Sequence, residues 1–481
     1  MYKIILLISL SFLLLNCSFD NKTGIWNDTS NIEKVSVKKI EQKNRKVVGQ
    51  SECKFYYLKC DDTKQQIIYN ENLEDIFVKR ETFSSLKESN SEYTVEIEKI
   101  IMNKNWTEEY YSSLNNVPNI NYINKKKRLH KSSKLSKFFI RSNLDYTKPV
   151  KPLFYNNNII SFDHKGTVYI YSLTTKKKIW EFNFYNKKFK KYDKKLFLAV
   201  KEGKIYVSDN LGYLYCLDME KKKMLWAKNY GVPFRSNLKI DENQLFLANQ
   251  DNIIFSVDLI SGLKNWQFET SLTFLKSDFK NNILIDKKNN NLFFYNTSGE
   301  FYSINYVNQK INWVLNFKNS SFGNDKTLFL SLPIVIKDNN FLISTNISLL
   351  KYNVSSGTKE WDKAIEVALK PTINLNHVYL VTKTNLLVCI NINTGNVIWS
   401  KAIFDNLDIK KKKLGIPTNL IIAENQIIIF TSQGFLLNYD YKSGDLISKT
   451  RITRFGLGTD PIFANGHLFV YNKKYQLLKF E

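Results

Sequence analysis

The side chains best suited to metal binding or acid–base catalysis are few in this sequence and widely spaced. Its four histidines fall in a basic stretch, a predicted hairpin turn and two predicted strand starts: His130, His164, His377 and His467. None stands at a spacing typical of a zinc ligand set. The Gly-x-Ser-x-Gly, His-Glu-x-x-His and glycine-rich phosphate-loop motifs are also missing. The sequence therefore predicts no catalytic residues, no metal site and no cofactor.

One cysteine indicates export and a lipid anchor. Cys17 follows an apolar run at residues 4–15, which is too short to cross a bilayer and is typical of a signal peptide. The ending Leu-Leu-Asn-Cys resembles a bacterial lipobox, although Asn16 stands where Gly, Ala or Ser is usual. We expect residues 1–16 to be a lipoprotein signal peptide and Cys17 to be lipidated. Secretion without lipidation is the alternative.

The other four cysteines predict no metal site either. In an exported chain Cys53 and Cys60 form a small disulfide loop or remain two thiols. Cys216 and Cys389 occupy predicted strands, where we expect buried, inert free thiols. Residues 18–134 show no repeat and are rich in Asn, Ser, Lys and Glu. We expect 17–134 to be a lipidated tether, partly disordered, with short local structure.

The charge balance is strongly basic, with a formal net charge of +25. Such a charge would ordinarily favour nucleic acid or an anionic membrane as a partner. Only 7 of the 70 basic residues are Arg, however, whereas phosphate recognition favours arginine. The lysine runs at 187–195, 221–223 and 410–413 fall in predicted loops and turns, which favours a solvated face; attraction to anionic lipid is the alternative. We expect no nucleic-acid partner.

The elements that position these side chains belong to a repeat. An aromatic anchor recurs every 38 to 49 residues, with apolar residues nine and eleven positions before it and a short polar residue eight before it. The anchors are Trp180, Trp226, Trp266, Trp313, Trp361, Trp399 and, in a degenerate copy, Ser448. Glycine stands four before the anchor in four copies: Gly262, Gly357, Gly395 and Gly444. This pattern predicts a hairpin with an Asx-capped glycine turn, whose tryptophan packs between sheets.

Another strand precedes each hairpin, which gives eight paired units and predicts an all-β fold. The spacing suits four-stranded antiparallel blades, so we predict an eight-bladed β-propeller at residues 135–481, with seven blades as the main alternative. The last unit stops at Glu481 and lacks an outer strand. We expect residues 133–142 to supply it, so that the N- and C-terminal strands close the ring.

The repeat resembles that of pyrroloquinoline-quinone-type propellers, and LLVCININTGNVIW (386–399) carries the pattern. One branch of that family comprises quinone-dependent dehydrogenases, which hold the quinone over calcium, often beside a Cys-Cys pair; this sequence has no such pair. The other branch is the BamB family of lipid-anchored, eight-bladed propellers without a cofactor. The resemblance to BamB covers the lipobox and the predicted propeller.

The BamB resemblance extends to the segment VPFRSNLKIDENQLFLANQDN (232–252). It implies that Val232, Phe234 and Arg235 stand in place of a Leu-x-Leu-Arg motif that contacts the BamA subunit. Val and Phe depart from Leu but keep the order apolar, apolar, cationic. Independently, an arginine beside a loop phenylalanine could bind a partner's carboxylate and present an aromatic anchor. The alternative is a loop arginine that bridges a neighbouring blade.

A second contact motif of the family, Ser-Asp-x-Asp, is matched by Ser277 and Asp278, whereas Lys280 replaces its second acid. The resemblance implies a non-enzymatic scaffold, anchored by lipid on the periplasmic face of the outer membrane. Its implied partners are the BamA core protein and unfolded barrel proteins, whose folding and insertion it would assist. Two alternatives stay open: a quinone-dependent dehydrogenase-like propeller and an envelope propeller that binds glycans.

Overall fold

The computed structural model describes the following residues: 17–19, 26–28, 81–90, 94–137, 151–185, 189, 192–272, 280–317, 331–405, 407 and 411–481. The chain divides into two compact units, Met1–Val78 and Lys79–Glu481. In the first unit, β1 (Cys17–Phe19) pairs antiparallel with β2 (Trp26–Asp28). No helix among the described residues is long and apolar enough to cross a membrane.

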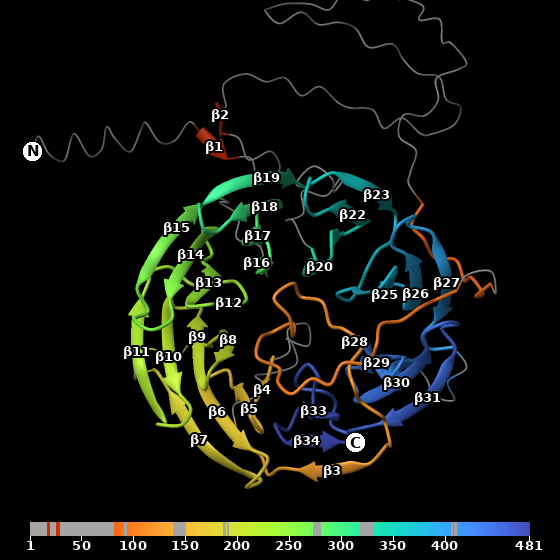
Figure 1. Ribbon diagram of the computed structural model, residues 1–481, viewed down its shortest axis with the longest axis horizontal. Coiled ribbons are helices and arrows are strands. Elements are labelled where there is room, and N and C mark those ends of the chain that lie inside the picture. Colours follow the sequence, from red (N-terminus) through yellow and green to blue (C-terminus); the bar gives the residue numbers. More distant parts are fainter. Residues whose placement is uncertain are drawn as a thin grey trace, which may run out of the picture. The chain divides into compact units, whose positions relative to one another are not determined.

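The second unit is a ring of eight four-stranded antiparallel sheets in its described residues, which confirms the predicted eight-bladed β-propeller (Figure 1). Blades 1 to 4 comprise β4 (Leu153–Tyr155), β5 (Asn158–Phe162), β6 (Thr167–Ser172) and β7 (Lys177–Asn183); β8 (Leu196–Lys201), β9 (Lys204–Asp209), β10 (Tyr213–Asp218) and β11 (Lys223–Asn229); β12 (Lys239–Asp241), β13 (Gln244–Ala248), β14 (Ile253–Asp258) and β15 (Lys264–Glu269); and β16 (Asn282–Asp286), β17 (Asn291–Tyr295), β18 (Glu300–Asn305) and β19 (Lys310–Asn316).

Blades 5 to 8 complete the ring and include the short helix α2 (Lys411–Leu414) in a connection. They comprise β20 (Val335–Lys337), β21 (Asn340–Ser344), β22 (Leu349–Asn353) and β23 (Lys359–Lys363); β24 (Thr372–Asn374), β25 (His377–Val381), β26 (Leu386–Asn391) and β27 (Val397–Ala402); β28 (Pro417–Ala423), β29 (Gln426–Thr431), β30 (Phe435–Asp440) and β31 (Leu446–Arg451); and β32 (Ile462–Ala464), β33 (His467–Tyr471), β34 (Leu477–Phe480) and β3 (Arg128–Lys131).

Burial along the strands follows from their place in a blade. Inner strands are largely buried because neighbouring blades cover both of their faces, and every residue of β25 is buried. Outer strands have one solvated face, so in β19 half-buried residues alternate with exposed ones and Lys310 is exposed. The core therefore lies between the sheets, and the exposed lysines of the outer strands lie on the rim.

The tryptophan anchors join neighbouring blades through the glycine turns. The indole Nε1 of Trp361 in blade 5 donates to the carbonyl of Ile392 in blade 6 at 2.7 Å. Its ring packs on Gly395, where an added Cβ would lie 2.9 Å from the indole. Trp226 and Trp313 make the same two contacts with the following blade. The glycine is therefore needed for its positive φ and also for the space that it leaves to the tryptophan.

Blade 8 closes the ring with a strand from the N-terminal side, as predicted, but from an earlier segment than 133–142. The closing strand is β3, in which Arg128 pairs with Phe480, while Lys127 and Glu481 exchange backbone hydrogen bonds. Residues 133–142 were expected to form this strand because they precede the first paired unit, as each Trp strand precedes the next unit. Outer strands in this protein are rich in lysine, because their edge and one face are solvated, and Arg-Leu-His-Lys fits that environment better.

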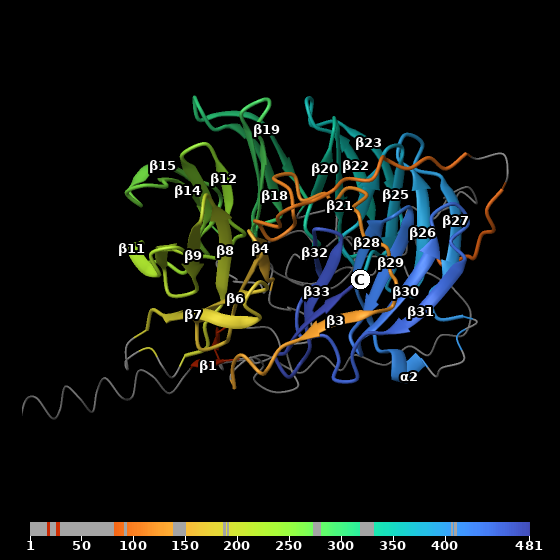
Figure 2. The ribbon, with the colours of Figure 1, turned by 60° about the horizontal axis from the view of Figure 1, so that its bottom comes forward.

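The chain before β3 also packs on the propeller, so the expected boundary at residue 135 does not separate a tether from the blades. We call residues 81–131 the N-terminal clasp. It begins on the outer strand of blade 6, where Lys87 and Ser400 exchange backbone hydrogen bonds. It then passes through the centre of the ring and leaves as β3; Figures 1 and 2 show this orange path. The clasp thus links the rim of one blade, the axis and the closing strand.

Candidate functional site

The predicted partner-binding loop connects blades 2 and 3 between β11 and β12. Val232 and Arg235 are half-buried, but Phe234 is only 1% exposed. The Phe234 ring packs edge-on against Tyr230 and Phe255 at centroid distances of 5.4 and 6.1 Å. Its predicted role as an exposed aromatic anchor is therefore wrong, because the ring belongs to the core between the two blades.

Backbone hydrogen bonds hold this loop in one conformation. Phe234 N donates to the Asp209 carbonyl at 3.0 Å, and Arg235 N donates to the Ala248 carbonyl at 2.9 Å. Gln250 N in turn donates to the Pro233 carbonyl at 2.9 Å. The loop is therefore tied to the second-to-third-strand turns of both adjacent blades, which presents Val232 and Arg235 on a rigid support.

The second predicted contact, at Ser277 and Asp278, lies outside the described residues. Lys280, which follows them, turns toward the axis and forms an ion pair with Glu109 of the clasp. Its ammonium also lies 4.6 Å from the centre of the Phe197 ring. Lys280 is thus used to hold the clasp, which explains why this position carries a cation here.

The centre of the propeller is filled by residues 101–121 of the clasp, which we call the axial segment. It makes hydrogen bonds with the strand nearest the axis in each of the eight blades. The partners in blades 1 to 8 are Phe154, Val200, Lys239, Ile285, Ile336, Ile373, Ile422 and Phe463. Such contacts with every blade make the axial segment a hub for the ring.

The axial segment is held by buried amides as well as by apolar side chains. Asn115 and Asn119 have no exposed area, and Trp106 is 4% exposed. The Asn115 amide donates to Asn282 at 3.0 Å and to the Ile334 carbonyl at 3.2 Å. The Asn119 amide is paired at both ends, because its nitrogen donates to the Glu98 carbonyl at 2.8 Å and its oxygen accepts from Asn425 N at 3.3 Å, and such pairing lowers the cost of burying it.

Lysines surround the axial segment, and only part of their charge is balanced. Lys239, with no exposed side-chain area, pairs with Glu108 at 2.6 Å. Lys151 pairs with Asp460, and burial lowers the pKa of Lys151 to about 8. Lys370 donates to the Asn115 carbonyl at 2.9 Å, and burial, with repulsion from Lys151 and Lys239, lowers its pKa to about 7. The four lysines Lys151, Lys239, Lys280 and Lys370 therefore outnumber their carboxylate partners Glu108, Glu109 and Asp460 at the axis.

The described residues contain no group of three or more His, Cys, Asp or Glu side chains placed to hold a metal ion. Cys216 and Cys389 are buried free thiols, as predicted, and burial raises the pKa of Cys216 to about 11. A thiol protonated at neutral pH is a poor nucleophile.

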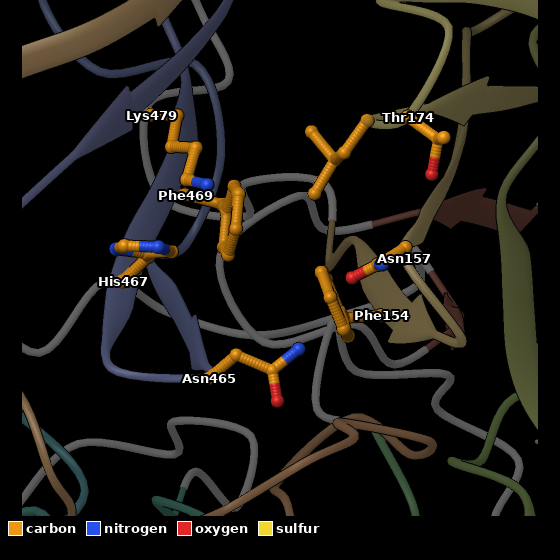
Figure 3. Close-up of a pocket in the computed structure, with 8 residues that line it drawn as sticks. Phe154, Asn157, Thr174, Asn465, His467, Phe469 and Lys479 are labelled. Atoms are coloured by element: carbon orange, nitrogen blue, oxygen red, sulfur yellow. The ribbon is translucent and has the colours of Figure 1, made fainter.

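A small cavity between blades 8 and 1 is also a poor cofactor site. Its volume is about 190 Å³, and Figure 3 shows His467 and Lys479 on one wall with Asn157 and Thr174 opposite. Pockets that enclose an organic cofactor usually measure roughly 300 to 1,000 Å³. The cavity can hold a few water molecules or a small ion, but not a quinone.

Comparison with known proteins shows which families this chain is similar to. The family model of the outer membrane protein assembly factor BamB matches residues 164–401. BamB of Shewanella oneidensis is 18% identical over 284 residues, which span 58% of this chain and 69% of that protein.

Solved structures show the same fold in proteins of different function. BamB from Moraxella catarrhalis aligns with a TM-score of 0.57 at 16% identity, covering 74% of this chain and 99% of its own. The quinohemoprotein alcohol dehydrogenase of Comamonas testosteroni aligns with a TM-score of 0.58 at 11% identity, covering 78% and 80%. Fold similarity at such identities does not distinguish an assembly factor from an enzyme. The family model and the named relative are both of BamB, so with the eight-bladed fold they show that this chain is similar to BamB-type β-propeller proteins.

Proposed function

We propose that this chain is a non-enzymatic scaffold of the machinery that assembles outer-membrane β-barrels. In this proposal a lipid on Cys17 anchors it to the periplasmic face of the outer membrane. It binds a BamA-type core protein and assists the folding and insertion of unfolded barrel proteins. The observation that carries the proposal is the match to the BamB family model across most of blades 1 to 6.

The filled axis supports a scaffold over an axial quinone enzyme. A dehydrogenase of this repeat family would need its cofactor near the axis, where eight blades converge. Here the axial segment occupies that region, and Asn115 and Ile120 within it have no exposed area. Lysine side chains surround the segment, whereas calcium is bound by oxygen ligands, chiefly carboxylates and carbonyls.

The loop between β11 and β12 is the proposed contact for the core protein. With Phe234 buried, the contact would rest on the half-buried Val232 and Arg235. A guanidinium beside an apolar side chain suits a partner surface that offers a carboxylate next to an apolar residue. Asp278, which lies outside the described residues, is proposed to extend this contact.

The rim of the propeller supports a role in handling unfolded barrel chains. Part of the clasp already lies as an extended segment along β27, the outer strand of blade 6. Lys87 N donates to the Ser400 carbonyl at 3.1 Å, and Ser400 N donates back at 2.9 Å. An outer blade strand can thus accept an extended segment, which is the mode by which strands of a client could pair.

Detergent co-purification tests the scaffold function. Tagged wild type, Arg235→Glu and the control Lys221→Glu, which reverses an exposed charge in the turn between β10 and β11, are compared for recovery of the barrel-assembly core subunit. Phe234 is left intact because its loss would disturb the core. We expect recovery with wild type and control and a loss of roughly tenfold with Arg235→Glu, since a charged hydrogen bond becomes a repulsion.

The other outcomes of this experiment separate the scaffold role from the Arg235 contact. Equal recovery in all three samples would keep the scaffold role and reject the Arg235 contact. No recovery in any sample would reject the scaffold role. Reduction of an electron-acceptor dye by purified protein given pyrroloquinoline quinone, Ca²⁺ and an alcohol would instead support a dehydrogenase.

A further inference from the structure

We propose that a basic cleft between blades 7 and 8 binds an acidic polypeptide segment. The cleft has a volume of about 390 Å³. It is lined by the end of β31 and the residues after it, by the closing strand β3 and by the connection of β33 to β34. Four of its lining residues are cationic: Arg128, Lys131, Arg451 and Arg454.

Arginine is concentrated here in a way that composition does not explain. The chain has 70 basic residues and only 7 of them are Arg, yet 3 of those 7 line this one cleft. Arg128, Arg451 and Arg454 are all exposed. The guanidinium fork binds a carboxylate through two parallel hydrogen bonds, which a lysine ammonium cannot do. The cleft therefore differs in kind from the lysine-rich rim.

No carboxylate of the described residues neutralises these cations. None of the four cationic residues is a member of the ion pairs that the described residues form. Arg451 and Arg454 instead lie over aromatic rings, with guanidinium carbons 5.2 Å from the Phe435 ring and 5.0 Å from the Phe455 ring. Four like charges around one concavity repel one another, and an anionic ligand would relieve that repulsion.

The walls indicate that the ligand carries apolar groups beside its charges. Ile452 and Leu478 line the cleft, and the half-buried Phe455 stands at its side. The Lys474 ammonium lies 3.9 Å from the centre of the Phe455 ring, so cations lie near this apolar patch. A segment in which Asp or Glu alternates with apolar residues matches this arrangement, because in an extended chain successive side chains point to opposite sides.

The shape favours a polypeptide over a membrane surface. A lipid headgroup layer is broad, and flexible lysines are sufficient to attract it. The cleft is a concavity whose arginines come from β3, from the end of β31 and from the residues after it, and these parts of blades 8 and 7 meet only once the ring is closed. The proposal does not depend on binding of a barrel-assembly core protein at Arg235.

Fluorescence anisotropy with the full-length protein in mild detergent tests this assignment. The probe is a fluorescein-labelled peptide in which Glu alternates with Leu, and the control peptide carries Gln in place of Glu. The variant Arg451→Gln with Arg454→Gln removes two cleft charges. The matched control, Lys221→Gln with Lys223→Gln, removes two exposed charges, one from the turn between β10 and β11 and one from the first residue of β11. Arg451→Lys with Arg454→Lys keeps the charge but removes the fork.

We expect wild type and the lysine-turn control to bind the Glu peptide equally. The double Gln variant should bind it roughly tenfold or more weakly, with the double Lys variant in between. Thermal melts check that all variants are folded. Equal binding of Glu and Gln peptides, or equal weakening in the cleft variant and the control, would overturn the proposal. So would arginine-dependent binding to phosphatidylglycerol vesicles without binding of the Glu peptide, which would identify a membrane surface instead.

Discussion

Glycine and tryptophan act as a pair at the contacts between blades. Each turn glycine has a positive φ, which a hairpin turn requires, and the indole of the preceding blade fills the space where a Cβ would be. The two demands are separable because some positive-φ glycines have open space beside them. Gly203 has φ +72° with no atom near its missing Cβ, whereas Gly444 has φ +75° with the Trp399 ring 2.5 Å away.

Substitution of these two glycines by alanine measures the blade contact. Both variants lose about 1 to 2 kcal/mol from the left-handed backbone. Gly444→Ala should lose about 1 to 3 kcal/mol more, because Trp399 must move out of a packed contact. Urea denaturation of both variants gives the difference. Equal midpoints would show that the indole contact contributes nothing beyond the turn.

Lys370, at the axis, makes the stability of the protein depend on pH. Its folded pKa of about 7 lies below its ordinary value of 10.5 because burial and two neighbouring lysines disfavour its charge. Between these two values the unfolded chain binds more protons at this position than the folded chain does, so the free energy of unfolding rises with pH. This cost of Lys370 is complete below about pH 7 and disappears above pH 10.5.

Replacement of Lys370 by methionine should therefore flatten the rise in stability between about pH 7 and pH 10. The measurement is denaturant unfolding of wild type and Lys370→Met at several pH values, compared as a difference because other groups also titrate. Lys221→Met, on an exposed lysine, is the control and should follow wild type. Identical pH profiles for Lys370→Met and wild type would contradict a depressed pKa.

At the scale of elements, the axial segment depends on a buried ion pair. Glu108 faces Lys239, which has no exposed side-chain area and also donates to the Ser112 carbonyl at 2.6 Å. Removing one member of such a pair leaves an uncompensated charge in the interior, whereas replacing both by apolar or neutral groups can be nearly neutral.

Glu108→Gln is expected to cost about 3 kcal/mol of unfolding free energy. The double variant Glu108→Gln with Lys239→Met should recover most of that loss. The control is Glu202→Gln, which removes a 78% exposed carboxylate that lies 3.8 Å from Lys201 and should change stability by less than about 1 kcal/mol. Similar losses in the single and the double variant would argue that the pair does not hold the axial segment.

The elements show which features a sequence pattern can predict. The hairpin with its Trp, Gly and Asx cap recurs along the sequence, so each copy supports the interpretation of the others. The number of paired units then predicts eight blades. Phe234 was open to misinterpretation because a loop aromatic resembles a binding anchor. The same place in blades 6 and 8 holds Val367 and Leu457, which are 3% and 8% exposed and form the same bridge to the adjoining turn. An apolar residue that recurs at one position of the repeat is typical of packing.

At the scale of the whole molecule, the clasp is the part that local patterns do not predict. Its contacts connect residues several hundred positions apart, as between Asn103 and the Phe463 carbonyl. The axial segment has no strand period because successive parts of it contact different blades. The basic cleft escapes prediction for a related reason, since Arg128 and Arg451 meet only through ring closure.

Deletion of the clasp tests whether the propeller depends on it as a whole. Trp106, Val117, Ile120 and Tyr122 are each at most 4% exposed. At about 1.5 to 3 kcal/mol per large buried side chain, these four contribute on the order of 10 kcal/mol. That is comparable to the total stability of a typical domain.

A variant without residues 79–131, which also loses β3, should therefore lack a cooperative thermal transition. A variant without residues 18–78, which belong to the other compact unit, should melt like wild type. Calorimetry could instead give the clasp deletion the wild-type melting temperature. The eight blades would then be stable as an open ring, and the role of the clasp would lie in what it binds rather than in folding.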